Sequence, residues 1–311
     1  MKKTILATMA AAIQLASVAC SKSNNEAPDN ATNFEPKTPV YQYYTTNWDD
    51  GWVSTIKTDW VEVTKGSTRV LLHYPQAQTI IAADPAPLVN NAWDILVAPR
   101  YSNLKNYKVV SPSLDYERAY LGFGTVTENA SGKTVFVGLF RKGNSGWIEF
   151  ITADKNAFIQ QFGVDPETIN WSTTTDVWAK MRVMSNYNRF AVAPNDIAQT
   201  GKWTNNFGSN TYYYSMYTGL GVGMSSYSAT EEFTFTGADT YQWQLFVANS
   251  GGGASNMVKV KSSGKHNLPD NWSLHFSDIE GKAVTYPVWF AAVKNGRVFF
   301  INGNPFSWVG K

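Results

Sequence analysis

The stretch Glu231–Ala248, EEFTFTGADTYQWQLFVA, decides the fold of this protein. Its two halves, Glu231–Thr236 and Thr240–Ala248, are rich in Phe, Tyr, Trp, Thr and Val, the residues that β-strands favour. A short segment with Gly237 and Asp239 divides them, and both residue types are common in turns. We therefore predict two neighbouring strands here and search for further strands on either side.

These strands belong to a longer region without a helical period. From about Ile197 onward, short strand-like segments alternate with turns rich in Gly or Asn. The six further candidate strands are Lys202–Phe207, Thr211–Tyr217, Met257–Ser262, Trp272–Ser277, Ala283–Val293 and Arg297–Asn302. Eight antiparallel strands in so short a region suit a closed barrel, because closure leaves no exposed sheet edge. We predict an all-β antiparallel barrel over residues 196–311, with a β-sandwich as the other possibility.

Residues 41–195 show a different pattern, which predicts an α+β domain. Asp84-Pro85 has the order of a helix start, and Asp154 and Gly163 have the residue types that begin and end a second helix. Further helical turns are expected after Asp165 and Thr175. The candidate strands are Trp60–Val63, Thr68–Tyr74, Tyr107–Ser111, Arg118–Thr127, Thr134–Arg141 and Gly146–Thr152. A sheet covered by helices would bury the apolar faces of these segments.

The composition excludes a disordered chain and argues against a nucleic-acid-binding protein. The 311 residues are 43% hydrophobic and 16% charged, with 17 Phe, 16 Tyr and 12 Trp, so the chain can bury enough apolar surface to fold. Lys2 and Lys3 lie in an N-terminal leader, and without them basic and acidic residues are equal in number. Non-specific binding to nucleic acid needs a basic surplus, which the mature chain would lack.

The N-terminus predicts export and lipidation. A positive start, Met1–Lys3, precedes the short apolar segment Thr4–Ala19, and the chain's single cysteine follows as Cys20. The run Leu15–Cys20, LASVAC, resembles a bacterial lipoprotein lipobox. The resemblance implies cleavage before Cys20 and acylation of that residue, for example with palmitate, which would anchor the protein in a membrane.

A polar tether follows the cysteine. Residues 21–40, SKSNNEAPDNATNFEPKTPV, carry few large apolar side chains. A Ser after the cysteine and a polar spacer are similar to outer-membrane lipoproteins of the Bacteroidetes type, which implies an outer-membrane location and leaves the side of that membrane open. The predicted order is a signal peptide (1–19), an acylated tether (20–40), the α+β domain (41–195) and the barrel (196–311).

Three short patterns in the barrel region resemble the lipocalin family. Gly201 and Trp203 form a Gly-x-Trp signature, and Asp239-Thr-Tyr241 is similar to the mid-barrel pattern of lipocalin-like bacterial domains. Arg297 stands where that family keeps a basic residue before the last strand. The resemblance implies that its guanidinium stacks on the indole and closes the barrel base. Gly201, Trp203 and Arg297 are therefore expected to be structural and not catalytic.

No pattern in the sequence points strongly to catalysis, a metal or a cofactor. The segment His275–Glu280 contains an imidazole and carboxylates, but residues three apart on a strand face opposite sides, and its end has the composition of a turn. Glu231 and Glu232 also face opposite sides, so they form no glycosidase pair. His73 is expected to be a hydrogen-bonded strand residue. We expect no cofactor and no metal, and an enzyme is the least favoured class.

The abundant aromatic side chains favour a binding protein. The preferred hypothesis is a non-enzymatic, membrane-anchored lipoprotein that holds a small apolar molecule or a lipid in its barrel. The alternatives are a glycan-binding accessory protein at the cell surface and a structural partner of an outer-membrane assembly. Which aromatics face inward depends on the strand register. The candidate ligand-binding residues are Tyr213, Tyr217, Trp243, Phe246 and Trp289.

Overall fold

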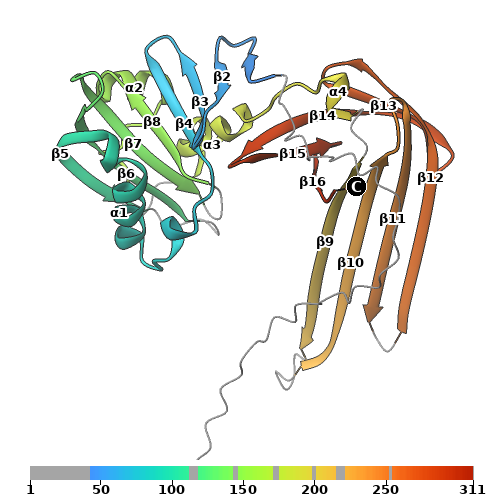
Figure 1. Cartoon of the computed structure of the whole chain (residues 1–311). Coiled ribbons are helices and arrows are strands. Elements are labelled where there is room, and N and C mark those ends of the chain that lie inside the picture. The colour runs from blue at the N-terminus through green and yellow to red at the C-terminus, as the bar shows by residue number, and fades with distance from the viewer. Residues whose placement is uncertain are drawn as a thin grey trace, which may run out of the picture. The chain divides into compact units, whose positions relative to one another are not determined.

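The chain forms two separate sheets, which Figure 1 shows. The computed structural model describes residues 43–111, 118–142, 146–170, 175–197, 201–214, 221–251 and 254–310, without the side chains of 142, 175, 176, 209–214, 221–225, 251 and 254. One sheet is open and eight-stranded, and the other is a closed barrel of eight strands. The predicted fold class, an α+β region followed by a lipocalin-like antiparallel barrel, is confirmed.

The open sheet is antiparallel and has the order β1-β2-β3-β4-β8-β7-β6-β5. Its strands are β1 (Thr45–Asn47), β2 (Val53–Ile56), β3 (Trp60–Lys65), β4 (Thr68–His73), β5 (Tyr101–Val110), β6 (Ala119–Glu128), β7 (Thr134–Lys142) and β8 (Ile148–Thr152). The six strands predicted in this region all exist. The sequence analysis missed β1 and β2, because three and four residues are too short to show a pattern.

Helices pack against both faces of this sheet. On one face, α1 (Pro85–Leu96) buries Val89 and Trp93 beside Leu71 and Val137. On the other, α2 (Lys155–Phe162) buries Phe158 and Phe162 beside the sheet's aromatic residues. The remaining helical segments are η1 (Ala77–Ile80), η2 (Ala98–Arg100), η3 (Thr175–Trp178), α3 (Ala179–Arg182), η4 (Val183–Tyr187) and α4 (Pro194–Ile197). Two covered faces explain why neighbouring residues such as Val70 and Leu71 are both buried.

The predicted helix ends are largely confirmed. The Asp154 carboxylate accepts a hydrogen bond from the Ala157 backbone N–H at 2.8 Å, and Gly163 ends α2 with a φ of 70°, a conformation that glycine adopts without strain. Helix α1 begins at Pro85, as predicted, but the side chain of Asp84 makes no capping hydrogen bond.

The barrel is a simple up-and-down arrangement in which each strand pairs with the next along the chain. Pairing of β16 with β9, at Ser307 with Thr204 and at Trp308 with Trp203, closes it. The strands are β9 (Gly201–Tyr214), β10 (Gly221–Phe235), β11 (Thr240–Gly251), β12 (Ala254–Asp270), β13 (Ser273–Ile279), β14 (Lys282–Val293), β15 (Gly296–Ile301) and β16 (Asn304–Trp308).

The number of strands was predicted correctly, but two assignments were wrong. Residues 202–207 and 211–214 belong to one strand, β9, because Gly208 pairs with Ser228 and continues the ladder. The eighth strand is β16, which the sequence analysis missed because it is short and contains Pro305. Strand β10 is also longer than predicted, beginning at Gly221.

The segment 190–197 packs against one end of the barrel. Val192 and Ile197 belong to the barrel's core cluster, and Phe190 exchanges two backbone hydrogen bonds with Phe290. The buried carboxylate of Asp196 forms an ion pair of 2.7 Å with Arg297. The domain boundary predicted at residue 195 falls within α4 and stays a prediction.

A buried polar cluster lies on the α1 face of the open sheet. The Glu149 carboxylate, which is fully buried, accepts hydrogen bonds from His73 at 2.9 Å, from Tyr101 at 3.0 Å and from Arg100. Burial favours the neutral acid, but the His73 hydrogen bond and the Arg100 charge outweigh it and lower the pKa of Glu149. This cluster confirms His73 as a hydrogen-bonded strand residue. The Trp60 ring, 5.0 Å from the guanidinium of Arg100, covers the group.

We predict that Glu149→Gln destabilises the protein by about 3 kcal/mol, because it leaves buried partners of a carboxylate without its charge. Equilibrium urea unfolding at neutral pH measures this loss. Glu128→Gln is the matched control, since Glu128 pairs with Arg69 nearer the surface, where an ion pair contributes at most about 1 kcal/mol. Equal losses in the two variants would contradict the prediction.

Candidate functional site

Side chains fill the barrel where all eight strands meet. The buried hydrophobic residues there are mostly aromatic and come from every strand except β12, which contributes the buried His266. They are Trp203, Phe233, Phe235, Tyr241, Trp243, Leu274, Phe276, Ile279, Val288, Phe290, Phe299, Ile301 and Phe306. Their rings contact one another, as between Phe233 and Phe276 at 5.0 Å between centroids. The middle of the barrel is therefore a packed core.

Four of the strands continue past this core. Strand β9 pairs with β16 only at Trp203 and Thr204, and β12 pairs with β13 only at residues from His266 onward. Beyond these points β9 to β12 pair only with one another, as the long arrows of Figure 1 show. The inner face of the barrel sheet thus continues as an open four-stranded surface.

The register shows which residues lie on this continued inner face. Residues that pair directly across two strands have side chains on the same face of the sheet. Phe233 and Trp243 pair directly and are both buried in the core, so the side chains in register with them are on the inner face. Two residues further along each strand comes a row of Asn205, Glu231, Leu245 and Val260, and then a row of Phe207, Ala229, Val247 and Val258. Apart from Asn205 and Glu231, both rows are apolar.

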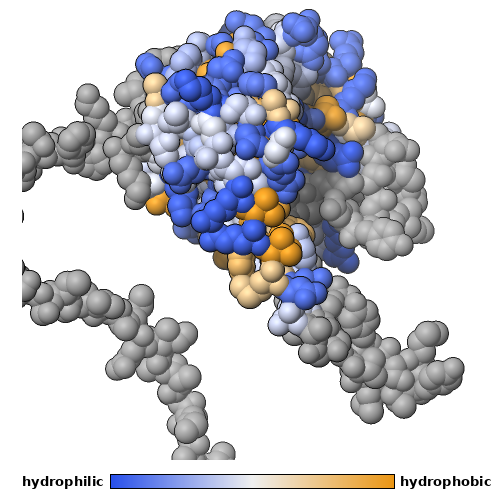
Figure 2. Space-filling view, turned by 90° about the vertical axis from the view of Figure 1, so that its right-hand side faces the viewer, coloured by the Kyte–Doolittle hydropathy of each residue, from blue (hydrophilic) through white to orange (hydrophobic). Residues whose placement is uncertain are grey.

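The apolar part of this face is exposed. Phe207 is 57% exposed, Val258 is 53% exposed, and Tyr227, one row further, is 38% exposed. Phe207 and Tyr227 make an edge-to-face contact with centroids 5.9 Å apart. The space-filling view in Figure 2 shows apolar surface at several places, with one group near the lower edge of the coloured surface beside hydrophilic residues. We call Phe207, Tyr227, Leu245, Val247, Val258 and Val260 the apolar inner face.

Glu231 lies between the packed core and the apolar inner face. The indole N–H of Trp243 donates a hydrogen bond of 2.9 Å to one of its carboxylate oxygens. Burial raises the pKa of Glu231, and the nearby charge of Glu280 raises it further, while the indole acts in the opposite direction. Burial, together with Glu231 and Glu280, also raises the pKa of Tyr286. A half-buried carboxylate therefore stands among apolar, neutral and like-charged groups.

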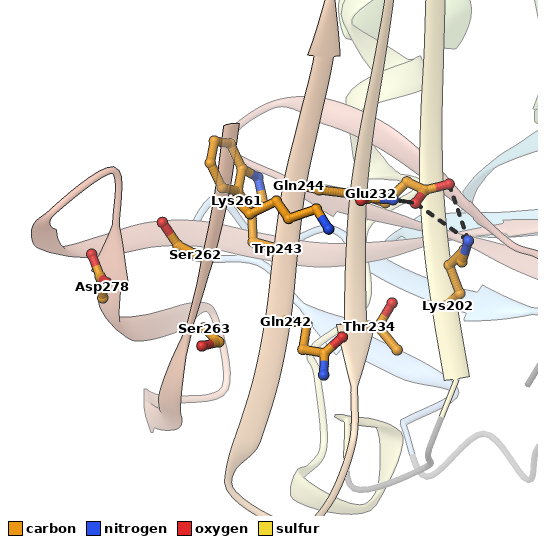
Figure 3. A pocket seen from close by; sticks show the side chains of 10 residues that line it. All are labelled: Lys202, Glu232, Thr234, Gln242, Trp243, Gln244, Lys261, Ser262, Ser263 and Asp278. Atoms are coloured by element: carbon orange, nitrogen blue, oxygen red, sulfur yellow. Dashed lines mark hydrogen bonds and ion pairs between the residues drawn. The ribbon is translucent and has the colours of Figure 1, made fainter. Parts of the chain in front are cut away.

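The outer face of the same strands carries a polar hollow of about 530 Å³. Figure 3 shows the Lys202 ammonium directed toward the Glu232 carboxylate, with which it pairs at 3.2 Å. The side-chain amide of Gln244 also donates a hydrogen bond to Glu232. The lining residues are Lys202, Glu232, Thr234, Gln242, Trp243, Gln244, Lys261, Ser262, Ser263 and Asp278. Two of its charged residues, Lys202 and Glu232, are thus paired with each other.

The three predicted ligand-binding residues whose side chains are described, Trp243, Phe246 and Trp289, do not all lie on one face of the barrel sheet. Trp243 is in the core and 4% exposed, whereas Phe246, three residues along β11, lies on the opposite face. Trp289 stacks on Phe300 with centroids 5.1 Å apart, and the Arg189 guanidinium lies 4.5 Å from its ring. Their role as ligand-binding residues stays a prediction.

Three other predicted residues fall partly or wholly outside the description. Tyr213 belongs to β9, but its side chain is not described, and Tyr217 and Cys20 lie outside the described residues. Their predicted roles in ligand binding and lipidation therefore stay predictions.

The three residues of the Gly-x-Trp resemblance all lie at the closed end of the barrel. Trp203 packs against Phe290 and Phe299 with centroid distances of 5.8 and 5.4 Å. The guanidinium of Arg297 lies 3.8 Å from the Phe290 ring centroid. A Cβ on Gly201 would come within 2.4 Å of the Trp308 indole nitrogen, so a larger residue here would require the indole to move. Each residue has a packing contact, in keeping with a structural role.

Sequence reasoning missed Glu231 as a site residue, although the signal was present. It placed Glu231 and Glu232 on opposite faces, which the register confirms. Glu231 has the same parity as Phe233 and Phe235, so a buried carboxylate could have been expected from the alternation alone. The alternation does not predict where along β10 the packed core ends.

No family model, curated protein or solved structure matches this chain. Within the described ranges, no helix has the length and apolarity needed to cross a membrane.

We predict that Glu231→Gln raises the melting temperature by roughly 2 °C at about pH 7. A carboxyl group whose pKa is raised in the folded state binds protons more tightly there than in the unfolded chain. Ionised Glu231 therefore destabilises the folded state, and this destabilisation develops as the pH rises through the raised pKa. The gain in melting temperature from Glu231→Gln should shrink as the pH is lowered toward about 4. Glu280 and Tyr286 are the titratable groups that act with it.

Thermal unfolding followed by circular dichroism between these pH values tests this prediction. Glu232→Gln is the control, because it removes an acidic partner of Lys202 on the outer face and should bring no gain. A Glu231→Gln variant that is less stable than the parent at neutral pH would refute the prediction.

Proposed function

We propose that this protein is a non-enzymatic, membrane-anchored lipoprotein that binds a small apolar molecule or a lipid on the apolar inner face. The observation that carries the proposal is the exposure of Phe207, Tyr227 and Val258 on the continuation of a barrel's inner surface. A group of large apolar side chains exposed together marks a binding surface more often than scattered ones do.

The energetics of this face favour an apolar ligand. Each Å² of apolar surface removed from water contributes about 25 cal/mol, and the face offers aliphatic side chains from β11 and β12 and aromatic rings from β9 and β10. The packed core beneath, with Trp203, Phe233 and Trp243, gives the surface a rigid floor. A ligand there would need little rearrangement of the barrel, which lowers the entropic cost of binding.

The glycan hypothesis receives less support from the outer hollow. Sugar rings bind to exposed aromatic faces, and Trp243, the aromatic residue in its lining, is 4% exposed. The charged groups Lys202 and Glu232 already pair with each other. The apolar inner face therefore supports a binding function better than the hollow does.

We predict that the full chain carrying Cys20→Ser, which avoids detergent, binds the neutral apolar dye N-phenyl-1-naphthylamine. Val258→Gln should weaken this binding about tenfold, since it replaces an aliphatic contact of the inner face with an amide. Dye fluorescence titrations give the dissociation constants.

The adjacent residue provides a matched control. Met257 is 71% exposed but lies on the outer face of the same strand, so Met257→Gln should leave dye binding unchanged. Equal effects of the two substitutions, or no dye binding by the parent chain, would refute the proposed site.

The lipid anchor is proposed from the sequence run that ends at Cys20. We predict that cells given labelled palmitate incorporate it into the wild-type protein and not into Cys20→Ser, because the thiol is the acylated group. Electrophoresis and detection of the label after organic extraction measure incorporation. An unlabelled wild-type protein would remove the anchor from the proposal without affecting the ligand site.

A further inference from the structure

We propose that the ligand of the apolar inner face carries a cationic amine, which pairs with the carboxylate of Glu231. This inference rests on the proposed function and adds the polar group of the ligand. It assigns to the site an amphiphile with an apolar body and an ammonium group.

The position of Glu231 supports an ion pair with a ligand amine. On β10 it is paired with Asn205 of β9 and Leu245 of β11, in the row between the core and the exposed apolar residues. A ligand whose apolar body covers Phe207 and Val258 would have its inner end beside Glu231, two residues deeper along each strand. That separation is about 7 Å, so a ligand end could reach the carboxylate while the body stays on the apolar surface.

The electrostatics at Glu231 select the sign of the ligand's charge. Its carboxylate accepts the Trp243 indole N–H at 2.9 Å, and the charged group that acts on it is a second carboxylate, Glu280. By contrast, Glu232 pairs with Lys202 and Glu149 pairs with Arg100. Glu280 thus adds to the negative potential at Glu231 and makes the Glu231 charge less favourable, whereas the charges of Glu232 and Glu149 are compensated by basic partners.

A ligand ammonium would supply the missing compensation. Hydrogen bonds between an ammonium and a carboxylate are about twice as strong as neutral ones, and low solvent access strengthens them further. An anionic amphiphile would instead bring a third negative charge toward Glu231 and Glu280. The site should therefore discriminate between amphiphiles of equal chain length by the sign of the head group.

The test compares dodecylammonium with laurate, both below their micellar concentrations, by isothermal titration calorimetry at neutral pH. The protein is the full chain carrying Cys20→Ser. We expect dodecylammonium to bind at least about tenfold more tightly than laurate. In Glu231→Gln, its affinity should fall about tenfold and the preference should disappear. Glu231→Lys should reverse the preference in favour of laurate.

The control and the dye keep the two proposals separate. Glu232→Gln, one residue away on the outer face, should keep the full preference for dodecylammonium. If the parent chain and Glu231→Gln bind both amphiphiles equally while the neutral dye still binds, the amine assignment is wrong and the apolar site stands. If the parent chain binds neither the amphiphiles nor the dye, both proposals fail.

Discussion

The unequal length of neighbouring strands is the constraint on which the rest of the barrel depends. Strands β9 to β12 have 12 to 17 residues, whereas β13, β15 and β16 have five to seven. A strand pairs only over the length that its neighbour shares, so closure is confined to one part of the long strands. Where eight strands surround the axis, aromatic residues fill the interior, and where four remain, the same inner face is exposed.

The two-residue period of the strands then separates apolar from charged groups. Val258 and Glu231 fall on the inner face, while Met257 and Glu232 fall on the outer one. Substitution of adjacent residues can therefore separate the two faces within one strand. The same period explains why the polar hollow, most of whose lining residues lie on the outer face, shares no side chain with the apolar inner face.

Two buried carboxylates show how their partners decide the effect of burial. Glu149 is fully buried, but His73, Arg100 and Tyr101 surround it and its pKa is lowered. Glu231 is less buried, yet burial raises its pKa and the acidic neighbour Glu280 adds to the rise, because the hydrogen bond from the neutral Trp243 indole does not outweigh them. The first arrangement stabilises the open sheet. The second costs stability, and groups of this kind gather at functional sites.

The sequence by itself determined the fold class, both ends of α2 and the opposite directions of Glu231 and Glu232. These properties follow from local composition, capping residues and strand alternation, which act over a few residues. Only the tertiary structure decided that Gly208 continues β9, that β16 closes the barrel and that Glu149 meets Arg100. It also decided where the core ends along β10, and therefore that Glu231 borders an exposed apolar surface. These features depend on the register between segments far apart in the chain, which no local pattern specifies.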